Sequence, residues 1–249
     1  MNCTTHNTMP LRHQQGLTLV EIMIAITISL LLLAGVMQIF LGSKSSYNLQ
    51  NGLGRLQENG RYAMDILDRN IGMAGLSSNP NSPIDPIVQA NTADNASPNT
   101  DLGFSVANGQ ASDIIEIEYF SATDCLGNAT GGNAIDRYYI DGTDLMCLGN
   151  GSNTPQVLAE GVENMQILYG EDLSGDFMAD KYVSAGNVTT WANIVSVRIA
   201  LLVNTVESVG GEDTGVYALL NAPPIGPLED NLARRVFTRT ILLRNKLDT

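Results

Sequence analysis

The sequence contains very little histidine. Its two histidines, His6 and His13, both precede an apolar segment that begins at Leu17. If the residues before Leu17 are removed, no histidine is left, which excludes a Ser-His-Asp or Cys-His nucleophile and a zinc ion held by histidine. Paired carboxylates survive this exclusion. However, Glu116 and Glu118 lie two apart on an expected strand, so we expect both to point outward at the surface rather than to form an acid–base pair.

Positive charge is also scarce. The 249 residues include 13 Lys and Arg against 26 Asp and Glu, for a formal net charge of −13 and a pI near 4.4. Nucleic-acid binding needs clustered cations, so a nucleic acid is not expected as a direct ligand of high affinity. The 44% of hydrophobic residues suffice for a core, and the length allows one sizeable domain plus an extension.

Cysteine is limited to three residues. Cys3 lies in the front end, which leaves Cys125 and Cys147, a spacing too wide for a CxxC motif. One disulfide is the simplest interpretation and implies an oxidising compartment, while two free buried thiols are the alternative. The bridge would close a loop of about 22 residues and stabilise the fold by roughly 3–4 kcal/mol.

One long stretch has no charge at all. No charged residue occurs between Glu21 and Lys44, and the leader 1–16 contains Arg12 and no acid. As a helix, residues 17–41 would span about 37 Å, enough to cross a bilayer core of about 30 Å, with the basic leader staying in the cytoplasm. The run is too long for a secretory signal peptide. A plain membrane anchor leaves Glu21 unexplained, because a carboxylate at the membrane boundary is costly unless partnered.

The segment Gly16-Leu17-Thr18-Leu19-Val20-Glu21 resembles the processing signal of type IV prepilins and pseudopilins. The resemblance implies that prepilin peptidase removes residues 1–16 by cutting after Gly16, and that the new terminal residue, Leu17, is methylated. It also implies that Glu21 pairs with the terminal amine of a neighbouring subunit and so sets the register of packing. The family usually has Phe at the first mature position, so Leu17 is a departure.

A second helical pattern follows the uncharged run. Apolar or small residues recur every three or four positions at Leu49, Leu53, Leu56, Gly60, Ala63, Met64, Leu67, Ile71 and Ala74. We therefore predict one long helix over 17–75, apolar on all sides in its first half and amphipathic in its second, with a stop at Gly75. The glycines predict bends or local melting near 42–54, because each lowers helix propensity by about 1 kcal/mol.

Beyond the helix the pattern changes. Residues 77–101 are rich in Asn, Ser, Pro and Asp and predict a long loop. Alternation at a period of two then predicts strands at 102–107, 115–119, 135–140, 144–148, 162–169, 194–204, 216–220 and 234–243. The fold class is α+β, in which the amphipathic half of the helix packs on the largely antiparallel sheet of a domain over 76–249.

Four later segments narrow the resemblance to the PilW-type minor type IV pilins. They are the helix end at 59–63 with 67–75, the segment 159–170, the strand containing Trp191, Val195, Arg198, Ile199 and Leu201, and the segment 237–245. The resemblance implies a long N-terminal helix on an antiparallel sheet and a structural, non-enzymatic subunit. It implies an anchor in the inner membrane with a periplasmic domain. That subunit then enters a surface filament with other minor and major pilins, priming assembly or forming the tip.

Two alternatives stay open. Pseudopilins of type II secretion share the N-terminal motif, and only the later segments separate them from pilins. A membrane-anchored periplasmic binding domain or carbohydrate-active domain would carry the motif by chance. The sequence does not distinguish among adhesion, twitching motility and DNA uptake.

An acidic run offers a candidate metal site. Asp172, Ser174, Asp176 and Asp180 fall at positions 1, 3, 5 and 9 of an EF-hand-like loop. Phe177 replaces the glycine of position 6, and no Glu occupies position 12. An acidic, solvated hairpin loop and a weak calcium site are the two interpretations, and no other cofactor is expected.

The last predicted strand is basic in an otherwise acidic chain. Its cations are Arg234, Arg235, Arg239, Arg244 and Lys246. A solvated or salt-bridged sheet edge is the simpler interpretation. A docking face for an acidic subunit, or a weak contact with DNA, is the other.

Overall fold

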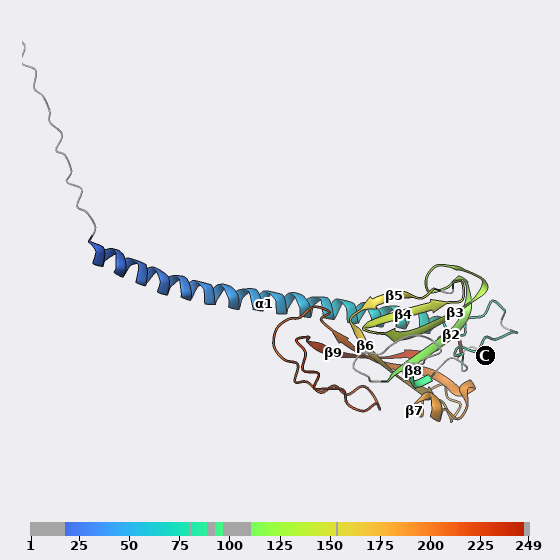
Figure 1. The fold of residues 1–249 in the computed structure, drawn as a ribbon. Coiled ribbons are helices and arrows are strands. Elements are labelled where there is room, and N and C mark those ends of the chain that lie inside the picture. The colour runs from blue at the N-terminus through green and yellow to red at the C-terminus, as the bar shows by residue number, and fades with distance from the viewer. Residues whose placement is uncertain (1–17, 80, 89–92, 97–110, 153, 247–249) are drawn as a thin grey trace, which may run out of the picture. The chain divides into compact units, whose positions relative to one another are not determined.

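The structure is a computed structural model that describes residues 18–79, 81–88, 93–96, 111–152 and 154–246 (Figure 1). The chain divides into two compact units, Met1–Tyr47 and Asn48–Thr249, and one helix contributes residues to both. In chain order the elements are α1 (Leu19–Met73), β1 (Ala93–Ala96), β2 (Ser112–Thr123), β3 (Ala129–Asp141), β4 (Asp144–Gly149), β5 (Gln156–Glu160), β6 (Val162–Glu171), β7 (Lys181–Val183), the 3-10 turns η3 (Ala185–Asn187) and η4 (Trp191–Asn193), β8 (Ile194–Asn204), β9 (Arg234–Leu242) and η5 (Arg244–Lys246).

The first half of α1 contains one stretch that is long and apolar enough to cross a membrane, and none of that stretch is buried. All side chains from 18 to 51 are exposed. The helix stops where the sequence predicts. Gly75 has a φ of +79° and its N–H donates to the Glu118 carbonyl at 2.8 Å, so the chain leaves the helix through a left-handed residue.

The predicted local melting near 42–54 does not occur, because α1 is helical without interruption from Leu19 to Met73. Two of the α1 glycines serve packing instead. A Cβ on Gly52 would collide with the Val209 side chain, and one on Gly60 would collide with the Phe237 ring. Glycine lowers helix propensity at these two positions, but its lack of a side chain lets other segments approach the helix backbone.

The β-domain holds two antiparallel sheets rather than the single sheet that the sequence suggested. The strand orders are β1-β2-β3-β4-β5 and β7-β6-β8-β9. Gly161, at φ +79°, lies in the one-residue connection between β5 and β6, where the chain passes from the first sheet to the second. Alternation along a strand defines its faces but not its neighbours, which is why the sequence did not separate the two sheets.

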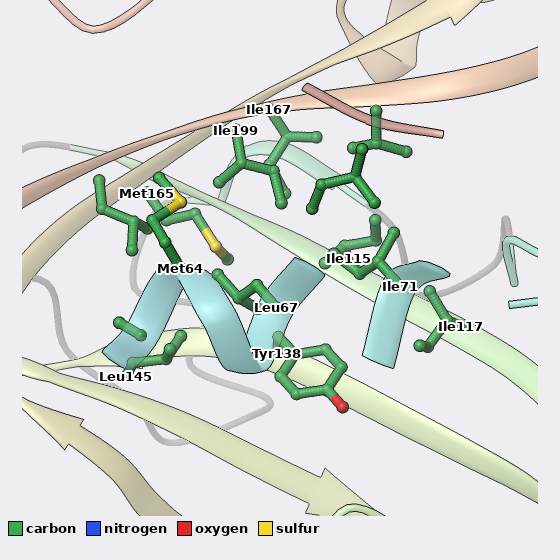
Figure 2. Packing of buried hydrophobic residues seen from close by; sticks show 14 of the residues in the cluster. Met64, Leu67, Ile71, Ile115, Ile117, Tyr138, Leu145, Met165, Ile167 and Ile199 are labelled. Atoms are coloured by element: carbon green, nitrogen blue, oxygen red, sulfur yellow. The ribbon is translucent and has the colours of Figure 1, made fainter. Parts of the chain in front are cut away.

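The core lies between the amphipathic half of α1 and both sheets. Figure 2 shows Met64, Leu67 and Ile71 of α1 pointing into a cluster with side chains from both sheets. The first sheet contributes Ile115, Ile117, Tyr138 and Leu145, and the second contributes Met165, Ile167 and Ile199. All these residues are at most 3% exposed, so the second half of α1 is a core element of the domain.

Several predicted strands differ from the observed ones. Residues 216–220 form only an isolated bridge, between Tyr217 and Ile225, and residues 102–107 lie outside the described part of the chain. The predicted loop 77–101 contains β1. Strands β5 and β7 were not predicted, because five and three residues are too short for a clear alternation.

The Gly60 contact gives a first prediction. We expect Gly60→Ala to lower the free energy of unfolding by about 1–3 kcal/mol, because the new methyl group overpacks the Phe237 ring. The matched control is Gly54→Ala, where the new methyl meets nothing within 4 Å and should stabilise by up to about 1 kcal/mol. Urea unfolding followed by the fluorescence of the single tryptophan, Trp191, measures both. If both substitutions change the free energy of unfolding equally, helix propensity and not packing against Phe237 determines the effect at Gly60.

Candidate functional site

The processing motif lies at the start of α1. Gly16 and Leu17 fall outside the described residues, and Thr18 is the first residue that the structure describes. The Thr18 carbonyl accepts the N–H groups of Glu21 and Ile22, and its hydroxyl oxygen also accepts the Glu21 N–H at 3.3 Å. Thr18 is thus the N-cap, and Glu21 occupies the third helical position. The helix therefore begins two residues after the predicted cleavage point.

Two hydroxyl groups in the apolar half of α1 bond to the backbone of the same helix. The Thr27 hydroxyl donates to the Ile24 carbonyl at 2.8 Å, and the Ser29 hydroxyl donates to the Ala25 carbonyl at 2.7 Å. Both hydroxyls therefore find a partner within the helix, as a hydrocarbon environment requires. Glu21 is the only acid in this half of the helix, and its side chain is exposed.

The two cysteines of the β-domain are bonded. Cys125 and Cys147 form a disulfide with a Cα–Cα distance of 6.7 Å, as the sequence predicted. Behind the bridge lies Asp136, which is fully buried. Its carboxylate accepts the N–H of Cys125 at 3.0 Å and the hydroxyl of Tyr119 at 2.6 Å. These bonds join β2, β3 and the disulfide loop.

Burial controls the titration of this group. Burial disfavours the charged carboxylate and raises the pKa of Asp136, although the hydrogen bonds from Tyr119 and Cys125 oppose the shift. Burial, reinforced by Asp136, also raises the pKa of Tyr119, so Tyr119 stays a hydrogen-bond donor. The network fixes the structure around the disulfide.

The acidic loop is held by its own carboxylates. Asp172 accepts the backbone N–H groups of Ser174, Gly175 and Phe177 at 2.7–3.0 Å. Asp180 accepts the N–H of Leu173 and shares the N–H of Ser174 with Asp172. Phe177 has a φ of 63°, so the backbone adopts the left-handed turn although the expected glycine is missing.

The acids of this loop do not converge on one point. Among the described residues, the one group of three Cys, Asp or Glu ligand atoms close enough to share a metal is Cys125, Asp136 and Cys147. Two of its members are committed to the disulfide. Asp172, Ser174, Asp176 and Asp180 therefore act in this structure as loop-forming hydrogen-bond partners.

The prediction that Glu116 lies at the surface is wrong. Glu116 is 5% exposed and forms an ion pair with Arg137 at 2.7 Å. Glu118 accepts a hydrogen bond from the Asn133 amide at 2.9 Å. The face that alternation marked as outward is thus partly covered, and each acid has a partner across the β2–β3 pair.

The basic strand contains one buried cation. The Arg234 side chain is fully buried and donates to three carboxylates, those of Glu163, Asp213 and Asp230, at 2.6–2.9 Å. Asp213 and Asp230 belong to the β8–β9 connection, residues 205–233, and Glu163 belongs to β6. Apolar side chains of the same connection, Leu219 and Ile225, cover Ala200 and Leu202 of β8. Arg234 therefore fastens this connection to the second sheet.

The same contacts change the pKa values of the side chains around Arg234. Burial alone would raise the pKa of Asp213, but the Gly215 N–H and the Arg234 guanidinium outweigh it and lower that pKa. The hydrogen bond from Arg234 lowers the pKa of Asp230. Burial, together with Asp213, raises the pKa of Tyr217 to about 12. The cluster is a charged clamp at neutral pH.

The other cations of this strand lie nearer the surface. Arg239 pairs with Asp65 at 2.8 Å and with Asp68 at 3.5 Å on α1, and Lys246 lies 3.8 Å from Asp85. The Arg235 guanidinium lies over the Phe237 ring. The prediction of a salt-bridged edge is thus confirmed for Arg234 and Arg239.

Two functional groups were missed at the level of sequence. Asp136 shares its parity with Tyr138 and Ile140 on β3, so alternation alone would have placed it on the inward face. The role of Arg234 had no such signal, since its partners Asp213 and Asp230 lie in a segment without periodicity.

Comparisons with known proteins find one match for the β-domain and one for the N-terminal segment. Residues 128–245 match the family described as Type IV Pilus-assembly protein W, and residues 11–37 match the Prokaryotic N-terminal methylation motif. A type IV-like pilin from Thermus thermophilus is similar at 14% identity and a TM-score of 0.48, over 77% of this chain and 98% of that chain. No curated protein matches the chain.

Proposed function

We propose that this chain, whose residues 128–245 match the PilW family and whose residues 11–37 match the methylation motif, is a PilW-type minor type IV pilin that primes pilus assembly or forms part of the pilus tip. The observation that carries the proposal is the combination of two features in one chain. A methylation motif opens an exposed apolar helix, and the same helix ends as the core element of a PilW-type domain. The proposed role is mechanical, so no catalytic residue is assigned.

The proposed life of the subunit has two stages. In the first, the leader stays in the cytoplasm, residues 17–41 anchor the chain in the inner membrane and the β-domain lies in the periplasm. Prepilin peptidase cuts after Gly16, and Leu17 is methylated. In the second, the helix leaves the membrane and packs among other minor and major pilins, where Glu21 neutralises the terminal amine of a neighbour.

A place at the tip or in a priming complex suits the size of the domain. The β8–β9 connection adds a layer over the second sheet, and bulk of this kind need not repeat around a filament when one copy lies at its end. Deleting the gene should therefore strongly reduce the number of pili, while isolated filaments should contain the subunit in far smaller amount than the major pilin. A subunit spread evenly along the shaft at major-pilin abundance would contradict the proposal.

A pseudopilin of type II secretion is the second candidate, favoured by the N-terminal motif alone. The deletion strain separates the two. Loss of pili with normal secretion supports the pilin, and normal pili with a secretion defect supports the pseudopilin. Gly16→Val should leave either kind of filament subunit unprocessed and unassembled. The same substitution should not affect an anchored binding domain.

We further propose that the subunit needs no cofactor and that the loop 172–180 is a hydrogen-bonded turn. The alternative is a weak calcium site at Asp172, Ser174, Asp176 and Asp180. Calorimetric titration with calcium separates the two, because a turn gives no heat of binding and no thermal shift at millimolar calcium. A heat that disappears in Asp172→Asn would establish the site instead.

A further inference from the structure

The second sheet has one long edge without a partner among the described strands. β9 pairs with β8 through nine residues without a register shift, and no described strand lies on its other side. The remaining edge strands are short or irregular. β1 and β7 have four and three residues, and β5 has five and a register shift against β4. A long regular edge is a ready template for a further strand, which proteins usually prevent.

The orientation of the β9 backbone follows from one hydrogen bond. The Leu243 N–H donates to the Val195 carbonyl on β8 at 2.9 Å. The backbone N–H and C=O groups of successive residues in an antiparallel strand point to alternate sides. The backbone groups of Ile241, Arg239 and Phe237 therefore also point toward β8. Thr238, Thr240 and Leu242 then direct their backbone groups away from β8. All three residues are exposed.

A groove runs beside this edge. It has a volume of about 530 Å³, and Thr240, Ile241 and Leu242 form its β9 side. The other lining residues come from the last turns of α1, Arg69 among them, and include Arg244 of η5. Asp65 and Asp68 on α1 are already paired with Arg239. Arg69 and Arg244 have no ion-pair partner among the described residues, so the groove offers two unpaired cations beside free backbone groups.

We propose that the free edge of β9, at Thr238, Thr240 and Leu242, docks an extended acidic segment of a neighbouring pilin, which extends the second sheet by one strand. Backbone hydrogen bonds hold the segment in this mode, and side chains beside it select the partner. Arg69 and Arg244 select for carboxylates. The inference rests on the proposed role as a filament subunit, which supplies the neighbour.

The backbone N–H of Thr238 tests this directly. Thr238→Pro removes an N–H that faces away from β8, so the β8–β9 pairing keeps its hydrogen bonds, and proline is tolerated at such an edge position. Thr238→Val removes the hydroxyl and keeps the N–H. In the full chain in its own cells we expect Thr238→Pro to lower the number of pili about tenfold or more and Thr238→Val to leave it unchanged. Equal piliation by both variants would overturn the proposal.

A second measurement covers the case in which Thr238→Pro fails to accumulate. A photoreactive amino acid at Thr240, in piliated cells, should form an adduct with an acidic segment of another pilin, identified by mass spectrometry. A self-adduct, an adduct with a non-pilin only, or no adduct would overturn the proposal. The deletion strain distinguishes a failure of the proposed function from a failure of the docking proposal. If deletion leaves piliation normal, the proposed function fails; if deletion abolishes pili but both Thr238 variants assemble normally, only the docking edge fails.

Discussion

Arg234→Met should lower the free energy of unfolding by about 3–5 kcal/mol, the largest effect that we expect from one side chain. Methionine has a similar length but leaves the carboxylates of Glu163 and Asp213 inside the protein without their cation. These two side chains are 4% and 8% exposed, so water offers little compensation. Urea unfolding of the purified full chain in detergent, followed by Trp191 fluorescence, measures the change.

Arg235→Met is the matched control. Arg235 is the next residue on β9 and is exposed, and its guanidinium lies over the Phe237 ring. Its loss should cost at most about 1 kcal/mol. If the two variants are destabilised equally, the buried cluster has no special role and the clamp on residues 205–233 is wrong.

The pH dependence of the same cluster has a definite sign. The pKa values of Asp213 and Asp230 are lower in the folded protein than in the unfolded chain, so both acids stabilise the fold at pH values above about 4, the ordinary carboxyl range. That stability is lost as the pH falls through the lowered pKa values. In Arg234→Met the carboxylates take up protons more readily, so the gap between the two proteins should narrow on acidification. A gap that stays constant from pH 7 to pH 4 would contradict this account.

Removing the disulfide should be the second large effect. The double substitution Cys125→Ser and Cys147→Ser should cost about 3–4 kcal/mol, because the unfolded chain regains the entropy of a loop of 22 residues. The same loss should appear when the wild-type protein is unfolded in dithiothreitol. The reductant should not change the stability of the double-serine variant, which is its control. A loss below about 1 kcal/mol would show that the Asp136 network fixes this region without the bridge.

Much of the fold was predictable because its periodic segments are long. The stripe from Leu56 to Ile71 predicted the buried face of α1, and the stop at Gly75 was correct. What failed depends on contacts between distant segments. Both faces of β8 are covered, by the core on one side and by residues 205–233 on the other, so ten of its eleven residues are buried and its alternation marks no solvent face.

In the candidate site, too, the features that depend on contiguous residues were predictable and those that depend on distant contacts were not. The motif from Gly16 to Glu21 is contiguous, so the sequence alone identified it and the cap at Thr18 agrees with it. Arg234 was one of five cations between residues 234 and 246, and nothing in the local sequence distinguished it. Its identity as the buried one depends on a connection that returns Asp213 and Asp230 to the start of β9.

The mature N-terminus is the measurement that tests the central claim most directly. Mass spectrometry of the protein from its native membrane should find an N-terminal peptide that begins with methylated Leu17. That result would place the chain on the prepilin route and leave only its position in the filament to be determined. An intact leader, or a terminus beyond Ala34, would contradict the account and return the protein to the anchored or secreted proteins.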